Sequence, residues 1–213
     1  VFGDAMSRVS FSPKWASYQA WVEEVGEHGV VYVSAGYSAM GQLLHYWMGV
    51  ERTAYALADC PRLLHQVVDA VNANNLQLID LLAQSPADIV VMGDNFSSDV
   101  QPPAFFRKWS AAYYEEATRR LHAAGKRTAV HIDGRLKGAI RMIRETGADC
   151  GDAITPAPLG DLTPAECRAE AGPDFILSGG VSPDLWLPDA PLDAFKAKVL
   201  EWLRGVSPGV THR

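Results

Sequence analysis

The sequence contains few cysteines, and none of them lie in a spacing typical of a metal or redox motif. Cys60, Cys150 and Cys167 are far apart and odd in number. This usage is typical of a reducing compartment, so we expect a cytoplasmic protein. The absence of a C-x-x-C pair argues against a structural zinc knuckle.

The sequence also lacks runs of lysine or arginine. Its formal net charge is −6 and its isoelectric point is about 5.5. We therefore expect neither nucleic acid nor an anionic membrane surface as a partner. No apolar run reaches the roughly 18 residues that a membrane span needs, and no charged-then-apolar signal segment opens the chain.

Several nucleotide-binding and hydrolase motifs are absent. The sequence has no G-x-S-x-G and no P-loop, which removes serine hydrolases and nucleoside triphosphatases from consideration. "SAGYSAMG" (34–41) and the "SGG" at 178–180 are poor matches to the G-x-G-x-x-G dinucleotide fingerprint. We therefore do not expect a nicotinamide cofactor.

What the sequence does contain is an alternation of short apolar runs with helix-like segments. The runs span residues 29–36, 87–94, 126–133, 149–155 and 174–180, and most are rich in Val or Ile. No linker divides the chain, so we expect a single domain over residues 1–213. Strands that alternate with helices predict parallel βαβ units. Two folds fit this pattern, a partial (β/α)8 barrel with about five strands and an open doubly wound sheet.

The helices are marked by their ends. In "TPAE", Thr163 caps, Pro164 suits the first turn, and Glu166 completes a capping box, while Gly172 ends the helix. The other helices are expected over residues 13–25, 61–84, 103–124, 135–146 and 191–204.

The stretch "TAVHIDGR" (128–135) contains the main candidate site. Side chains alternate along a strand, so His131 and Asp133 are expected on one face. The carboxyl ends of parallel strands form the functional face in both folds, and two ionisable groups suit a ligand there better than a core. In the simpler alternative, His131 bonds a backbone carbonyl and Asp133 turns the chain or caps the next helix.

Other strand ends carry polar residues or glycines. Together with His131 and Asp133, a mouth built from them would suit a carboxylated ligand, a metal ion or proton transfer. Turn formation is the alternative explanation for these residues. The additional candidates are Asp94, Asn95, Arg135, Ser178, Gly179 and Gly180.

Four segments resemble the uroporphyrinogen decarboxylase superfamily. They are "GQLLHYWMGVE" (41–51), "DIVVMGDNFSSDVQPPAFFRKW" (88–109), "LHAAGKRTAVHIDGRLKGAIRMIRETGAD" (121–149) and "FILSGGVSPDLW" (175–186). The resemblance covers about residues 29 to 205. It implies a (β/α)8 barrel and favours that fold over the doubly wound sheet. About three of the eight strands would then lie outside this chain, or a homodimer would supply them.

The resemblance implies two chemistries. The decarboxylase branch removes carboxylates from a tetrapyrrole without a cofactor, as part of porphyrin biosynthesis. The methyltransferase branch moves a methyl group between a corrinoid and a thiol, using zinc held by His-x-Cys and a later cysteine. Here Asp133 replaces that cysteine, so the zinc ligands under this hypothesis are His131 and Asp133.

The leading hypothesis is an enzyme with lyase chemistry on a carboxylated ligand, with a tetrapyrrole as the implied example. His131 and Asp133 would manage protons, and Asp94 would polarise the reacting group. Tyr46 falls where the decarboxylases have a substrate-facing tyrosine, and Asn95, which falls where they have a serine, would also contact the substrate. Arg135 would hold a carboxylate, and Ser178, Gly179 and Gly180 would line the ligand.

A third hypothesis is a non-catalytic ligand-binding module. The decarboxylases' arginine-rich N-terminal motif, an essential aspartate on an early strand and a histidine motif near the last strand have no counterpart in this sequence. The missing aspartate favours a binding module, whereas the presence of His131 and Asp133 favours an enzyme.

Overall fold

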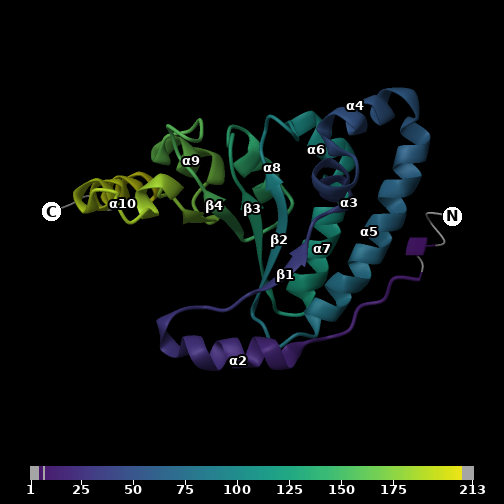
Figure 1. The fold of residues 1–213 in the computed structure, drawn as a ribbon, viewed down its shortest axis with the longest axis horizontal. Coiled ribbons are helices and arrows are strands. Elements are labelled where there is room, and N and C mark those ends of the chain that lie inside the picture. Colours follow the sequence, from purple (N-terminus) through teal and green to yellow (C-terminus); the bar gives the residue numbers. More distant parts are fainter. Residues whose placement is uncertain (1–4, 7, 208–213) are drawn as a thin grey trace.

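A computed structural model describes residues 5–6 and 8–207 and shows one five-stranded sheet (Figure 1). The strands are β1 (Val33–Gly36), β2 (Ile89–Phe96), β3 (Arg127–Ile132), β4 (Cys150–Ile154) and β5 (Ile176–Gly179). All pairs are parallel, and the order in the sheet is β1-β2-β3-β4-β5. The strands therefore follow one another as in a (β/α)8 barrel. The doubly wound alternative is wrong because the order of the described strands never reverses.

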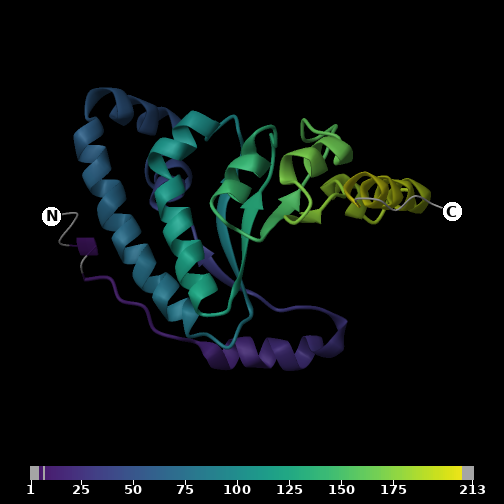
Figure 2. The ribbon, with the colours of Figure 1, turned by 180° about the vertical axis from the view of Figure 1, so that it is seen from behind.

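The helices that follow the strands cover one face of this sheet. Viewed from behind, α7 and α8 lie in front of the strands (Figure 2). Helix α5 contacts β1, and α7 contacts β3. Helix α8 contacts both β3 and β4, and α9 contacts β5. The opposite face corresponds to the inside of a barrel. No helix within the described residues is long and apolar enough to cross a membrane. The helices are α2 (Trp15–Val25), η1 (Gly26–His28), α3 (Ala39–Gln42), η2 (Leu43–Trp47), α4 (Gly49–Asp59), α5 (Pro61–Ala83), α6 (Pro103–Trp109), α7 (Ala111–Ala123), α8 (Ala139–Glu145), α9 (Pro164–Ala171), η3 (Pro183–Trp186) and α10 (Leu192–Val206).

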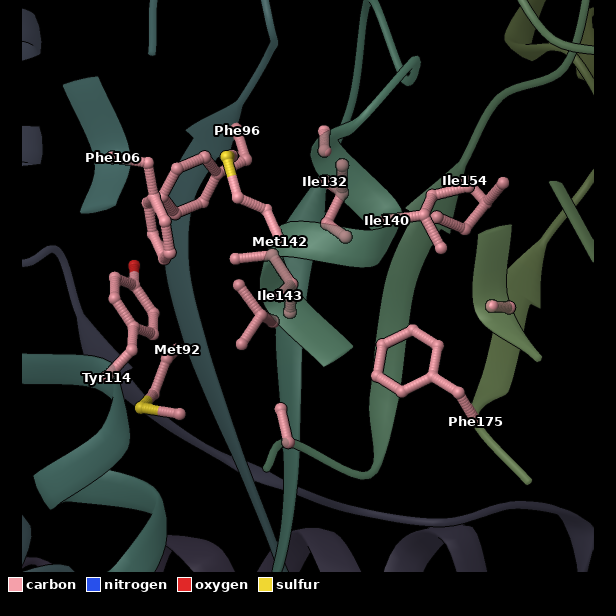
Figure 3. Close-up of a cluster of buried hydrophobic side chains, with 14 of the residues drawn as sticks. Met92, Phe96, Phe106, Tyr114, Ile132, Ile140, Met142, Ile143, Ile154 and Phe175 are labelled. Carbon is pink, nitrogen blue, oxygen red and sulfur yellow. The ribbon is translucent and has the colours of Figure 1, made fainter. Parts of the chain in front are cut away.

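The hydrophobic core lies between the sheet and this helix layer. On β3, Val130 and Ile132 are fully buried and point to the helices, whereas His131 between them does not. Figure 3 shows Ile132 with Ile140 and Ile143 of α8, among aromatic side chains from β2, α6 and α7. Alternate residues of each strand therefore pack the core, which leaves the residues between them free to build the inner face.

Several helix ends differ from the sequence prediction for local reasons. The helix expected over 103–124 is two helices, because Ser110 leaves the helical conformation. Helix α8 begins at Ala139 instead of residue 135, after a turn whose backbone N–H groups bond Asp161 and Glu170. The capping box of α9 is confirmed, with both of its hydrogen bonds between Thr163 and Glu166 present.

Three strands, β1, β2 and β4, bulge near their carboxyl ends, and two of these bulges contain a residue other than glycine with positive φ. The register of β2 shifts between Gly93 and Phe96, and that of β4 shifts between Gly151 and Ile154. Within the bulges, Asn95 and Ala153 adopt positive φ angles of 46° and 63°. Bulges redirect side chains, and residues other than glycine rarely adopt such angles, so both features mark the strand exits as specialised.

The packing of α10 against the end of β5 can be tested by comparing substitutions at Gly180 and Gly125. Gly180 and Gly125 both have positive φ, but a Cβ at Gly180 would lie 2.1 Å from Trp202 Cδ2, whereas a Cβ at Gly125 meets nothing within 4 Å. We expect Gly180→Ala to lower the free energy of unfolding by about 1–3 kcal/mol more than Gly125→Ala. Urea denaturation of both variants measures this difference. Equal losses would show that Trp202 moves aside freely.

Candidate active site

His131 and Asp133 project from the inner face at the end of β3. His131 lies on β3 and Asp133 directly follows it, and both side chains are partly exposed. The distance from His131 Nε2 to Asp133 Oδ2 is 3.9 Å. The side-chain alternation that the sequence predicted therefore places an imidazole and a carboxylate side by side at a strand exit.

A second carboxylate reaches His131 from β4. His131 and Asp152 are register partners, and His131 Nδ1 lies 3.2 Å from Asp152 Oδ2. Ser178 of β5 donates a hydrogen bond to Asp152 Oδ1 at 3.2 Å. Three neighbouring strands thus contribute one polar side chain each to a connected chain, Ser178 to Asp152 to His131. The sequence alone marked His131 and Ser178 but did not give the register that joins them through Asp152.

The charges and hydrogen bonds around His131 favour the protonated form of its imidazole. The hydrogen bond with Asp152 raises the pKa of His131, burial opposes this rise, and the charges of Asp133 and Asp152 add to it. Reciprocally, the bond with His131 lowers the pKa of Asp152, and the bond from Ser178 lowers it further. His131 therefore retains its proton to a higher pH than an isolated histidine and can act as an acid there.

Asp94 lies on the other side of the sheet, and its expected place in the mouth is wrong. Its side chain is 0% exposed and shares the helix-facing side of β2 with Val90 and Met92. The apolar run before Asp94 gave no indication of which face it occupies, since its residues are buried on both sides.

The contacts of Asp94 are structural. Ser38 donates to it through its backbone N–H at 2.7 Å and through its hydroxyl. Gly41 of α3 packs on the carboxylate so closely that a Cβ would lie 2.1 Å from Asp94 Oδ1. Burial raises the pKa of Asp94 to about 6, although the bonds from Ser38 act in the opposite direction. Asp94 therefore fixes the start of the segment that follows β1.

The polar exits of β2 and β3 are exposed. Asn95 lies within the bulge of β2, and Arg135 Nε lies 3.6 Å from Asp99 Oδ2. Ser97 and Ser98 bond the backbone of Arg135, so these two exits are tied together. Both Asn95 and Arg135 remain accessible to a ligand at this end of the sheet.

The exit of β5 provides one accessible side chain, Ser178. It also contains two glycines, Gly179 and Gly180, at positions where close packing leaves no room for a side chain. Ser178 is exposed and bonded to Asp152. A Cβ at Gly179 would lie 2.7 Å from the backbone of Ile154, so this glycine allows the close strand approach. Gly180 packs on Trp202 and lines a second cavity of about 470 Å³ together with Leu159.

An aromatic group lies at the exit of β1. Tyr46, in the π-helical turn η2, is 64% exposed, and its ring lies edge-on to Tyr37 with 5.0 Å between centroids. His45 also lies edge-on to Tyr37, at 5.4 Å. The sequence pointed to Tyr46 but missed Tyr37, because Tyr37 belongs to a turn in which no periodic pattern indicates its direction.

The inner face encloses a cavity of about 930 Å³. Val91, Ala129 and Cys150 line its floor, and Asp152 and Ser178 lie at its carboxyl end. Mostly apolar walls with a few convergent polar groups are typical of small-molecule sites. Asp152 and Ser178 thus border a space large enough for a ligand, and Asp152 connects it to His131.

The side chains around His131 do not form a zinc site. Within residues 5–6 and 8–207, no three His, Cys, Asp or Glu side chains are grouped so that they could hold a metal ion. Cys150 lies on the same inner face, but burial first, and then the charge of Asp152, raise its thiol pKa to about 12, which disfavours a thiolate ligand. His131 and Asp133 alone do not fit the tetrahedral set that catalytic zinc requires.

These features define part of a (β/α)8-type barrel with a polar site at the carboxyl ends of its strands. The chain belongs to the uroporphyrinogen decarboxylase family, since the model of "Uroporphyrinogen decarboxylase (URO-D)" matches residues 22–212. A solved methyltransferase from Methanosarcina mazei has the same fold, with a TM-score of 0.71 and 19% sequence identity. The match covers 88% of this chain and 53% of that chain, so this chain spans about half of that structure. A search of curated proteins gives no match.

The histidine–aspartate pair gives a titration prediction. Because the bond with Asp152 is the largest cause of the raised His131 pKa, Asp152→Asn should lower that pKa more than Asp133→Asn does. Imidazole chemical shifts of His131, followed by NMR against pH, measure both changes. An unchanged titration in Asp152→Asn would contradict the pairing. The wild-type pair stabilises the fold below the unfolded histidine pKa, and this contribution is lost as the pH rises through the raised folded pKa.

Buried Asp94 gives a stability prediction of its own. Its folded pKa of about 6 lies above the ordinary aspartate pKa of 3.8, so between these two pH values the folded state holds this proton more tightly than the unfolded state does. The free energy of unfolding should therefore fall by about 2 kcal/mol from pH 4 to pH 6 because of this group. Asp94→Asn should remove that slope, and urea denaturation across the range compares the two proteins. Parallel pH profiles would show that Asp94 titrates normally.

Proposed function

We propose that this protein is a cofactor-independent carboxy-lyase that acts on a carboxylated ligand of the tetrapyrrole class. The observation that carries the proposal is the chain from Ser178 through Asp152 to His131, beside the inner cavity. Membership of the uroporphyrinogen decarboxylase family supports the choice of reaction class and of ligand.

The chemistry needs a proton donor at the reacting carbon. Loss of CO₂ from a ligand carboxylate leaves the bonding electron pair on carbon, and a proton must replace the lost group. His131 is suited to supply it, because its Nδ1 side is held by Asp152 and its Nε2 side faces Asp133 at the partly exposed mouth. Asp152 stabilises the imidazolium before transfer and orients the ring. Solvent returns the proton after the product leaves.

Ligand binding is assigned to the exits around this pair. The exposed Arg135 guanidinium would hold a peripheral carboxylate, in exchange for its 3.6 Å contact with Asp99. Asn95 and Tyr46 are exposed at neighbouring exits and would contact other edges of the ligand. A ligand with several carboxylates would use both kinds of contact.

Methyl transfer has weaker support in this chain. The methyltransferase from Methanosarcina mazei shares the fold at 19% identity, and likeness at that level concerns the fold. This chemistry uses zinc, and no three His, Cys, Asp or Glu side chains within the described residues are grouped so that they could hold it. We therefore do not propose the corrinoid and zinc reaction.

The test compares two histidines that both pair with an aspartate. His131 pairs with Asp152 at the carboxyl ends of the strands, whereas His122 of α7 pairs at 2.7 Å with Asp149, which directly precedes β4 at the amino ends. With uroporphyrinogen III under anaerobic conditions, we expect His131→Gln to lose about 100-fold or more of the CO₂ release rate. His122→Gln should stay within a few-fold of wild type. Chromatography of the porphyrins after oxidation counts the remaining carboxylates.

Each other outcome has a definite meaning. Equal rates in wild type and His131→Gln would overturn the proton-donor role. Wild-type protein that binds the tetrapyrrole without releasing CO₂ would identify a binding module and overturn the lyase proposal.

A further inference from the structure

The two carboxylate oxygens of Asp152 have different partners on the inner face. Oδ2 lies 3.2 Å from Nδ1 of His131 on β3, whereas Oδ1 accepts a hydrogen bond of 3.2 Å from the hydroxyl of Ser178 on β5. A carboxylate that is bonded through both oxygens cannot rotate about its last side-chain bond without breaking one of these contacts. Ser178 therefore fixes the plane of the group that pairs with the imidazole.

The regular pairing of β4 with β5 ends at this contact. Gly151 pairs with Leu177, and the residues that follow them are Asp152 and Ser178. The bulge of β4 begins at this point, and Ala153 adopts a φ angle of 63° within it. A bulge disrupts the ladder locally, so the direction of the Asp152 side chain depends on its own contacts as well as on the strand.

The Asp152 side chain has room to turn away from His131. It is 30% exposed and lines the inner cavity of about 930 Å³. On the other side of His131, the register partner on β2 is Gly93, which has no side chain to support the ring. The bond from Ser178 thus holds Asp152 in place beside an open space.

Two carboxylates face His131, and the other inner-face neighbours are neutral. Asp152 contacts Nδ1, and Asp133 lies 3.9 Å from Nε2. On β4, burial and then the charge of Asp152 raise the pKa of the Cys150 thiol to about 12, which keeps it protonated. On β5, the Ser178 hydroxyl carries no charge. Its influence on His131 must therefore pass through Asp152.

We propose that Ser178 is a positioning residue that holds the Asp152 carboxylate against His131, instead of a residue that contacts the ligand. This inference rests on the proposed function, in which His131 donates the proton, and it assigns the Ser178 hydroxyl a role in that step. It differs from the sequence expectation that Ser178 lines the ligand.

The direction of the His131 pKa change in Ser178→Ala tests this role. If the hydroxyl holds the carboxylate in place, its removal loosens the pair and lowers the His131 pKa. If the hydroxyl only draws charge from Asp152, its removal leaves more negative charge beside the imidazole and raises that pKa. Imidazole chemical shifts of the ligand-free protein, followed by NMR against pH, distinguish the two. A raised or unchanged pKa would overturn the positioning role.

Two further variants test whether the effect passes through Asp152. Ser178→Thr keeps a hydroxyl and should return the His131 pKa toward the wild-type value. Ser178→Ala combined with Asp152→Asn should titrate like Asp152→Asn alone, because the pair of imidazole and carboxylate is already lost. Additive pKa changes in the double variant would contradict the proposal.

The matched control is Ser182→Ala. Ser182 also donates a hydrogen bond from its hydroxyl to an aspartate, but that aspartate is Asp184 in η3. The control should leave both the His131 titration and the rate of CO₂ release unchanged.

Kinetics with uroporphyrinogen III separate positioning from ligand binding. We expect Ser178→Ala to lower kcat for CO₂ release about five-fold and to leave KM unchanged, since the lost hydrogen bond acts on the proton donor. A raised KM with unchanged kcat would show that the hydroxyl contacts the ligand, which overturns the positioning role while the proposed function stands. Wild-type protein that releases no CO₂ would overturn the proposed function, and the ligand-free titration would still decide whether Ser178 positions Asp152.

Discussion

The register of β3 against β4 is the constraint on which the candidate site depends. It places His131 opposite Asp152, so that two side chains 21 positions apart meet across a pair of parallel strands. A shift of one residue in this register would turn one of them toward the helix layer and break the pair. The buried neighbours Val130 and Ile132 fix the register, because their side chains fill the core between the sheet and α8. Core packing thus determines which polar groups meet at the mouth.

The same sheet separates two kinds of buried or half-buried carboxylate. Asp152 and Asp133 lie on the inner face beside His131, and the bond with His131 lowers the pKa of Asp152. Asp94 lies on the outer face, where it is surrounded by Ser38, Gly41 and the helix layer and its pKa is raised. Strand exits rich in aspartate therefore contain both ligand-facing and structural residues. Which face a residue occupies decides between the two roles, since the residue type is the same.

Part of this arrangement could be predicted from the sequence. The joint direction of His131 and Asp133 follows from strand alternation, and the capping box of α9 follows from Thr163 and Glu166. Both depend on residues only two or three positions apart, so local geometry determines them.

The rest depends on contacts between distant parts of the chain. The role of Asp152 required the strand register, and the burial of Asp94 required the position of α3, which the pattern did not reveal. Tyr37 was missed because amides of α3 and α5 hold it in a turn without periodicity. Family resemblance supplied the fold type, whereas these long-range contacts could be seen only in the structure.

The division of labour between the two faces has a consequence for evolution. Ala129 and Cys150 line the cavity, whereas Val130 packs in the core and Gly151 lies close to Ile132 and Phe175. Mutations at these cavity positions can change the size and polarity of the chamber without disturbing the layer that stabilises the chain. Selection for a new ligand can therefore act on the strand residues that face the cavity and leave the core-facing residues unchanged. Relatives can in this way diverge in chemistry while they retain a common fold.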